Sequence, residues 1–201
     1  MGETLGETSG KLGRRLPEAN GFRQLAESLI HKGHVWNVAV GTFASPTGDV
    51  FERDLIRSPG AVGVVPLLYR DGVPTVMFVK QYRPPLDRVV LEIPAGVRDV
   101  VDEPTEVTAA RELAEEVGLK AASMEYLTHY YTSAGMTDSI LHLYLATDLT
   151  VVPAAAHGPE EEHMETLELP LADAVAMVVR GEIHDAKTVI GLLLVDRRLN
   201  S

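Results

Sequence analysis

Three glutamates lie within five positions of the segment AARELAEEVGL, and acidic side chains at this spacing can hold a hard metal cation. Glu112 and Glu116 share one face of a helix because they are four residues apart, and Glu115 lies beside them. Like charges at this spacing repel, and the helix macrodipole disfavours anions in the second half of a helix. A divalent cation bound by carboxylate oxygens would offset both penalties. The alternative without a functional role is that these glutamates form a solvent-facing acidic face of the helix.

The surrounding residues predict the helix that carries these carboxylates. The stretch 104–117 has a proline at its start, acids in its early part and Gly118 beyond its end. Arg111, four residues before Glu115, offers local charge relief. On a helical wheel the apolar side chains gather nearly opposite the glutamates, and we expect this apolar side to face the core: Val107, Ala110, Leu113, Ala114 and Val117.

The segment EIPAGVRDVVDEPTEVTAARELAEEVGL resembles the Nudix box, which has the form G-x5-E-x7-R-E-U-x-E-E-x-G-U with U aliphatic. The positions in register are Glu103, Arg111, Glu112, Leu113, Glu115, Glu116, Gly118 and Leu119. One departure is visible, because residues 97–102 between Gly96 and Glu103 are one more than the pattern has. A longer loop accounts for this departure and leaves the helix unchanged.

The Nudix resemblance implies an α/β/α sandwich with a mixed β-sheet, and hydrolysis of a nucleoside diphosphate linked to another group with Mg²⁺ or Mn²⁺. By this resemblance Glu112 and Glu116 are metal ligands, and Glu115 is a ligand or a near neighbour. Arg111 would orient the carboxylates. The Ala95 carbonyl would complete the inner coordination shell of the metal. Gly96, the next residue, would contact the substrate. Divalent ions would neutralise phosphoryl oxygens and acidify the attacking water.

Outside the box, the segments RDLIRSPGAVGVV, VKQYRPPL and LEIPAG resemble the branch that cleaves ADP-ribose and related nucleoside diphosphate sugars. Cleavage of ADP-ribose in this way gives AMP and ribose 5-phosphate. By the same analogy Arg57 and Arg83 would face phosphates or ribose, because a guanidinium binds phosphate in two places. Glu92 would support the metal or the terminal sugar. Trp36, the single tryptophan, would either stack on adenine across a dimer interface or pack in the core.

In that branch a glutamate on a loop after the box often acts as the general base. The segment HGPEEEHMETLEL supplies Glu160, Glu161 and Glu162, and we favour Glu161. The branch usually has a proline before a glycine beyond the box, where this chain has Ala134 before Gly135. This departure bears on the preferred sugar rather than on the diphosphate chemistry.

Composition limits the classes of protein to which the chain can belong. The 201 residues include 45% hydrophobic and 23% charged residues and no cysteine, which excludes thiolate chemistry and fits a reducing compartment. The formal net charge of -11 argues against a nucleic-acid surface. No apolar run of about 18 residues predicts a membrane span. The first residues lack the apolar core of a signal peptide, so we expect a cytoplasmic protein.

Patterning along the chain predicts an α+β protein with N-terminal antiparallel strands and a mixed sheet. We expect a disordered tail over 1–16, a helix and strands over 17–58, and a Nudix domain over 59–201. The N-terminal helix is predicted over 18–33, from the helical spacing of Phe22, Leu25 and Leu29. Hairpins are predicted around SPTGD and RDG, further strands in RVVLEIPAG, SMEYLTHYYTS and SILHLYLATDL, and helices in LADAVAMVVRG and DAKTVIGLLLVDRRL.

Several alternatives stay open. The substrate could instead be a GDP-sugar, a dinucleotide coenzyme or a flavin nucleotide. A non-catalytic module that senses ADP-ribose is a second alternative, although such modules usually lack the box glutamates that this chain keeps. The seven histidines show no H-E-x-x-H spacing, and their one H-x-x-H pair, His31 and His34, has no acidic residue between its members, which argues against zinc. Relatives imply a homodimer formed through the segment 17–58.

Overall fold

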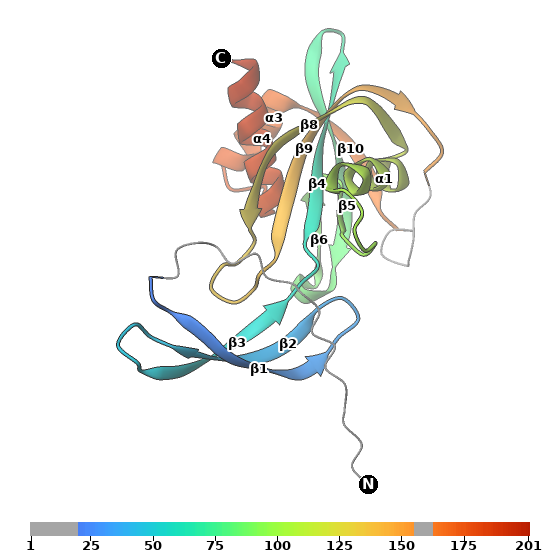
Figure 1. Cartoon of the computed structure of the whole chain (residues 1–201). Helices are drawn as coiled ribbons and strands as arrows, with labels where there is room; N and C mark the ends of the chain where they lie inside the picture. The colour runs from blue at the N-terminus through green and yellow to red at the C-terminus, as the bar shows by residue number, and fades with distance from the viewer. Residues whose placement is uncertain (1–19, 155–162) are drawn as a thin grey trace.

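The computed structural model describes residues 20–154 and 163–201, and its larger sheet has seven strands (Figure 1). Its main path runs β10 (Glu165–Pro170), β5 (Val73–Arg83), β4 (Ala61–Arg70), β9 (Ile140–Val151) and β8 (Leu119–Tyr131). Strand β6 (Arg88–Glu92) pairs with β5 after the short 3-10 helix η1 (Pro84–Leu86), and β7 (Ala95–Val97) pairs with β4. The β4–β9 pair is parallel and the other pairs are antiparallel, so the sheet is mixed.

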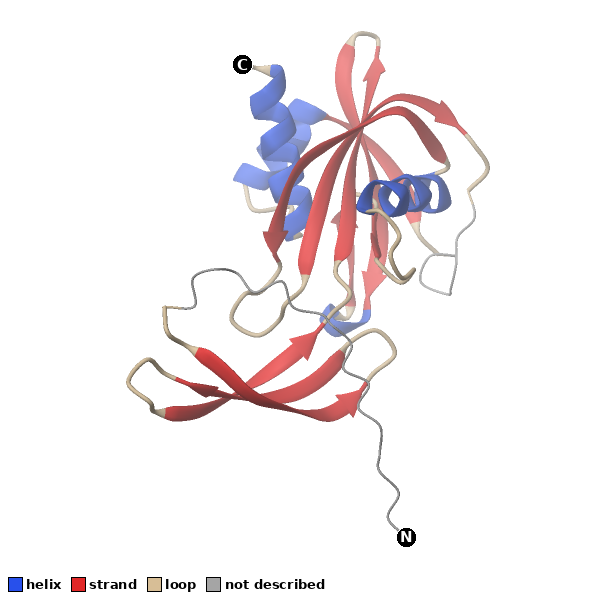
Figure 2. Cartoon of the chain, in the orientation of Figure 1, coloured by secondary structure: helices blue, strands red, loops and turns tan. Residues whose placement is uncertain are grey.

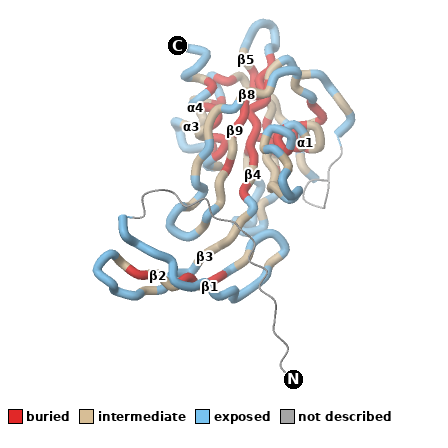
Figure 3. The backbone as a smooth tube through the Cα atoms, in the orientation of Figure 1, coloured by how far each residue is buried: buried red, intermediate tan, exposed pale blue. Residues whose placement is uncertain are grey.

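Helices cover both faces of this sheet (Figures 1 and 2). Helix α1 (Thr105–Val117) lies on one face, and helices α3 (Leu171–Val179) and α4 (Ala186–Leu199) lie on the other. Strand β4 alternates between the two cores: Val62 and Val64 face α1, whereas Val65 and Leu67 face α3 and α4. The buried residues are concentrated in the central strands of this sheet (Figure 3). The predicted α/β/α sandwich is confirmed.

A second, three-stranded antiparallel sheet lies below the sandwich in Figure 1. It consists of β1 (Arg23–Lys32), β2 (Asn37–Ala44) and β3 (Val50–Arg57). Strand β3 leads into β4 through residues 58–60, and Gly60 has a φ of 86°. A Cβ at Gly60 would lie 2.8 Å from the carbonyl oxygen of Ile140. The Ile56 N–H also donates to the Met136 carbonyl at 2.8 Å, which ties this sheet to the loop after β8.

The predicted helix over 18–33 is wrong. Strand β1 occupies Arg23–Lys32 of this segment and pairs with β2 along its whole length. Gly33 closes the hairpin instead of ending a helix: its N–H donates to the Trp36 carbonyl at 3.0 Å, and a Cβ there would overlap that oxygen. Helical spacing is a weak local preference, and the cross-strand hydrogen bonds outweigh it.

The other predicted elements are confirmed. Asp71 and Gly72 both have positive φ, 51° and 79°, as a two-residue hairpin turn requires. The turn before β3 closes with a hydrogen bond from Gly48 N–H to the Ser45 carbonyl at 3.0 Å. The tail predicted over 1–16 lies outside the described residues. Among the residues that are described, no helix has both the length and the apolar character that a membrane crossing demands.

Candidate active site

Helix α1 turns two of its glutamates towards the sheet. Glu112 and Glu116 are each only 7% exposed, whereas Val107 is 50% exposed and Ala110 is also exposed. The prediction that Val107 and Ala110 face the core is therefore wrong. The helix packs through Ala109 and the side chains near it, so its buried face is rotated towards the acids. Burying carboxylates is unfavourable without partners. The buried glutamates therefore do not form the solvent-facing acidic surface of the alternative interpretation.

Ala95 and Gly96, the first two residues of β7, contact these carboxylates. The Ala95 N–H donates to Glu116 Oε2 at 3.0 Å. Gly96 lies so close to Glu112 that a Cβ would overlap the carboxylate. Glycine is therefore required at position 96 if Glu112 is to keep its place. The Ala95 carbonyl as a metal ligand stays a prediction.

Arg111 joins four acidic side chains. Its NH1 atom lies 2.8 Å from Glu112 Oε1 and 3.0 Å from Glu115 Oε2. Its NH2 atom lies 3.2 Å from Asp99 Oδ1 and 3.6 Å from Glu103 Oε2. Burial lowers the pKa of Arg111, but the neighbouring carboxylates outweigh burial and raise that pKa above its ordinary value. Arg111 therefore stays charged and offsets the repulsion among the glutamates. Its role in orienting them stays a prediction.

The longer box loop takes up its extra residue before the helix begins. Asp102 has a φ of 61°, in the left-handed region that aspartate tolerates better than most residues. Glu103 then accepts a hydrogen bond from Thr108 Oγ1 at 2.7 Å and lies beside Arg111. The loop insertion thus leaves Glu103 next to the box helix.

The donor set fits a hard divalent cation. Glu112 and Glu116 lie against the Ala95–Gly96 backbone, Glu115 shares Arg111 with Glu112, and Mg²⁺ prefers such oxygen ligands. Within residues 20–154 and 163–201, no three acidic or histidine side chains already converge as a metal cluster. The glutamates hold protein partners instead, including Arg111 and the Ala95 N–H. A bound cation would therefore exchange with these partners.

Arg83 and Glu92, which were expected at the phosphates and the sugar, form a bidentate ion pair. Arg83 Nε lies 2.7 Å from Glu92 Oε1, and NH2 lies 2.6 Å from Oε2. Burial raises the pKa of Glu92, but the hydrogen bonds from Arg83 and the charge of Lys187 outweigh it and hold the pKa below its ordinary value. Hydrogen bonding to Glu92, together with the nearby charge of Glu116, raises the pKa of Arg83. The pair is therefore charged, and Arg83 lies close enough to Glu116 for their charges to interact.

A cavity of about 890 Å³ opens beside this ion pair. Its walls come from the η1–β6 segment and from the start of α4, and they include Arg83, Glu92, His184 and Lys187. Lys187 is not among the site residues predicted from the sequence. The available signal was a lysine in the first turn of a predicted helix, where the macrodipole disfavours a cation.

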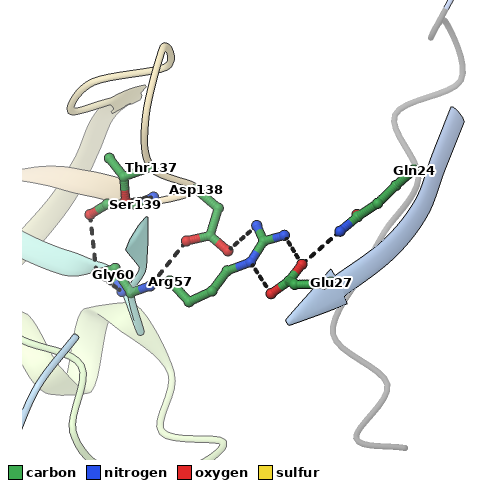
Figure 4. Close-up of polar contacts among 8 residues, drawn as sticks. Gln24, Glu27, Arg57, Gly60, Thr137, Asp138 and Ser139 are labelled. Atoms are coloured by element: carbon green, nitrogen blue, oxygen red, sulfur yellow. Dashed lines mark hydrogen bonds and ion pairs between the residues drawn. The ribbon is translucent and has the colours of Figure 1, made fainter. Parts of the chain in front are cut away.

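Arg57 links the small sheet to the loop after β8 (Figure 4). Its Nε and NH2 atoms donate to the two oxygens of Glu27 at 3.0 and 2.5 Å, and NH1 donates to Asp138 Oδ2 at 3.0 Å. A smaller cavity of about 260 Å³ borders it, lined in part by Ala134 and Gly135. Arg57 is thus bound by two carboxylates, and its contact with a phosphate or ribose stays a prediction.

Replacing Arg57 with methionine is expected to destabilise the protein at neutral pH by about 1 kcal/mol, because both ion pairs are partly exposed to solvent. This free energy corresponds to a decrease in Tm of about 2–4 °C for a chain of this size. Hydrogen bonds from Arg57 hold the pKa of Glu27 below its ordinary value of 4.5. A depressed pKa stabilises the fold above the unfolded-state value, and this contribution is lost as the pH falls through the folded-state value.

The Tm difference between wild type and Arg57→Met should therefore shrink once the pH falls below about 4.5. Calorimetric scans between pH 7 and pH 3 would measure it. Arg53→Met is the matched control, because Arg53 lies on the same strand and donates to the Glu52 carbonyl. A Tm difference that stayed constant with pH would contradict the pairing of Arg57 with Glu27.

Two other predicted residues have different outcomes. Trp36 lies in the turn between β1 and β2 and is 53% exposed, so the alternative of core packing is wrong. Its stacking on adenine stays a prediction. The expected general base, Glu161, lies outside the described residues, as do Glu160 and Glu162.

Comparisons with known proteins identify the family of this chain. A family model described as the NUDIX domain matches residues 57–190. An ADP-ribose pyrophosphatase of Bacillus subtilis (strain 168) is 36% identical over 170 residues, covering 85% of this chain and 90% of that protein. An ADP-ribose pyrophosphatase of Mycobacterium tuberculosis (strain ATCC 25618 / H37Rv) is 36% identical over 176 residues, covering 87% and 83%.

A solved structure shares the fold. The crystal structure of an ADP compounds hydrolase superposes with a TM-score of 0.75 at 22% identity, covering 89% of this chain and 94% of that one. The family match includes the box helix, the buried glutamates and the Arg83–Glu92 pair. The chain belongs to the Nudix family.

Proposed function

We propose that this Nudix chain hydrolyses the diphosphate bond of a nucleoside diphosphate sugar, and that its preferred substrate is ADP-ribose, cleaved to AMP and ribose 5-phosphate. The main support is the burial of Glu112 and Glu116 against the Ala95–Gly96 backbone, which is a site for cationic rather than apolar partners. The two ADP-ribose pyrophosphatases support the choice of substrate, since each aligns with more than four-fifths of the chain.

Nudix hydrolases generally need divalent metal ions, and the oxygen donors of this site suit Mg²⁺, with Mn²⁺ as a substitute. When bound, such an ion neutralises phosphoryl oxygens and lowers the pKa of a coordinated water. Glu112 and Glu116, with Glu115 beside them, would hold the ion. Arg111 would orient these carboxylates. The Ala95 carbonyl would supply a further oxygen.

Other residues would bind the substrate and accept the proton of the attacking water. Arg83 would donate to phosphate oxygens, and its guanidinium is already held in one orientation by Glu92. Groups fixed before the substrate arrives need no reorganisation during the reaction. Glu92 would support the metal or the terminal sugar, and Arg57 and Trp36 would contact the nucleotide. Glu161 is our choice for the general base that accepts the proton of the attacking water.

A hydrolysis panel tests this proposal. The substrates are ADP-ribose, NADH, GDP-mannose, UDP-glucose and diadenosine polyphosphates, each with and without Mg²⁺. We expect the highest kcat/KM for ADP-ribose and AMP as one product, and hydrolysis in ¹⁸O-labelled water would identify the phosphorus that is attacked. A preference for GDP-mannose or NADH would keep the chemistry and change the substrate. A lack of turnover with every compound would overturn the proposal and favour a sensing module.

We also propose that the three-stranded sheet joins a second copy of the chain. Several large apolar side chains are exposed on it or on its β1–β2 turn, including Leu25, Leu29, Ile30, Trp36 and Val50. Apolar side chains gathered in this way mark interaction surfaces. Light scattering should give a dimer for the wild type and a shift towards monomer for Leu29→Glu. A monomeric wild type at micromolar concentration would contradict this proposal.

A further inference from the structure

We infer that Lys187, on the first turn of α4, is a positioning residue that holds Glu92 and leaves Arg83 able to bind the substrate diphosphate. This inference rests on the proposed function, because it assigns Arg83 and Glu92 to substrate binding. Neither the Nudix box nor the resemblance outside it includes Lys187. The geometry at the start of α4 carries the inference.

Lys187 and Arg83 contact the same oxygen of a buried carboxylate, Glu92 Oε2. The Lys187 Nζ atom makes an ion pair with this oxygen, and it lies 3.1 Å from Asp185 Oδ1. Lys187 is 7% exposed and Glu92 is 2% exposed, so water screens their interaction little. Opposite charges therefore alternate along Asp185, Lys187, Glu92 and Arg83.

The first turn of α4 is itself fixed to the strand that carries Glu92. Asp185 caps the helix by accepting from Thr188 N–H at 3.0 Å and from Thr188 Oγ1 at 2.6 Å. The same Thr188 hydroxyl accepts from the Ile93 N–H at 2.9 Å, one residue after Glu92. Lys187 is thus presented to Glu92 by a helix end that is bonded to the neighbouring backbone.

The two cations have separate tasks. The bonds from Arg83 to Glu92 use Nε and NH2, which form one edge of the guanidinium. If Arg83 were the sole cation beside Glu92, a bound diphosphate and the buried carboxylate would compete for it. Lys187 adds a second positive charge at Glu92 Oε2, so Arg83 can share its charge with phosphate oxygens without leaving Glu92 unpaired.

Lys187 lies where a cation destabilises the helix, but where its side chain lines the cavity. A cation in the first turn of a helix opposes the macrodipole. Asp185, Lys187, Glu92 and Arg83 all line the cavity of about 890 Å³. The start of α4 therefore forms the wall of the cavity behind the pair that is proposed to bind the substrate.

The first test compares Lys187→Met and Lys187→Arg with wild type in the hydrolysis of ADP-ribose. We expect Lys187→Met to raise KM about tenfold with kcat within about threefold, because substrate binding weakens while the box glutamates stay intact. Lys187→Arg should restore KM to within about threefold of wild type, since it keeps the charge. Lys80→Met is the matched control, because Lys80 pairs with Glu165 at 3.5 Å on the surface, and its KM should not change. A KM unchanged in Lys187→Met would overturn the inference.

A double-mutant cycle separates positioning from a general effect on the fold. In a Glu92→Gln background, the further increase in KM caused by Lys187→Met should disappear if Lys187 acts through Glu92. Additive increases in KM, accompanied by additive losses of Tm, would show a merely structural lysine and overturn the inference. Lys187→Gln keeps a hydrogen-bond donor without the charge, and it takes the place of the methionine variant if that variant does not fold.

A binding measurement distinguishes failure of this inference from failure of the proposed function. Calorimetry with ADP-ribose whose bridging oxygen is replaced by methylene, in the absence of divalent cations, gives Kd without turnover. A wild type that binds the analogue but hydrolyses no substrate would overturn the proposed function, and the Kd ratio would still test Lys187. A hydrolytic wild type whose Kd is matched by Lys187→Met would overturn the role of Lys187 alone. A wild type that neither binds nor hydrolyses would overturn both.

Discussion

Glu116→Gln is expected to lower kcat for ADP-ribose by about 10²–10³-fold or more, because it removes a negative charge from the group that would hold the divalent ion. Glu116 is buried and accepts a hydrogen bond from the Ala95 N–H. The amide oxygen of glutamine can accept the same hydrogen bond, so the fold should persist. Steady-state rates over a Mg²⁺ titration, with circular dichroism to verify folding, would measure both effects.

Glu106→Gln is the matched control for this change. Glu106 lies in the first turn of the same helix but is exposed, so the same loss of charge there should leave kcat unaltered. Near-wild-type activity of Glu116→Gln on every nucleoside diphosphate would show that the metal site is assigned to the wrong residues.

Gly96→Ala should lower kcat/KM by about 10²-fold, since a displacement of about 1 Å in a catalytic group can have an effect of that size. The new Cβ would overlap the Glu112 carboxylate, so either the side chain or the box loop must move. We also expect more Mg²⁺ to be needed for half-maximal activation. Rates measured at increasing Mg²⁺ concentrations would reveal both changes.

Gly191→Ala separates this local effect from a general steric one. A Cβ at Gly191 would meet the Val65 Cγ2 atom at 2.7 Å in the core on the opposite face of the sheet. This variant should lower Tm and leave the Mg²⁺ requirement as in wild type. If Gly191→Ala and Gly96→Ala changed the Mg²⁺ requirement equally, the contact between Gly96 and Glu112 would not explain the loss.

The box helix shows how far the sequence supports a prediction. Its bounds followed from a proline start and a glycine end, and the metal-site hypothesis followed from the spacing of the acids. Its packing face did not, because a helical wheel assumes that apolar side chains face the core. Here Gly96 and Ala95 leave room for two carboxylates, so Glu112 and Glu116 turn inwards and Val107 turns out. The contact between the Ala95–Gly96 backbone and these two glutamates depends on tertiary structure, so the sequence of the helix alone does not predict it.

Strand β1 and Lys187 were missed for a related physical reason. Apolar residues at helical spacing over 18–33 predicted a helix, but the partner that makes this segment a strand is β2. Lys187 is separated from Glu92 by almost half the chain, and no local pattern pairs them. Partners of this kind are set by the sheet topology, which a single sequence reveals only through a family resemblance.

The short connection through residues 58–60 has a consequence for protein engineering. Gly60 has a left-handed backbone and leaves no space for a side chain beside the Ile140 carbonyl, so the orientation of β3 relative to β4 is tightly constrained. A chimaera that grafts the three-stranded sheet of another family member onto this catalytic half should therefore retain residues 58–60 unchanged. A graft point placed in the Ser45–Asp49 turn would instead split the sheet between the two parents.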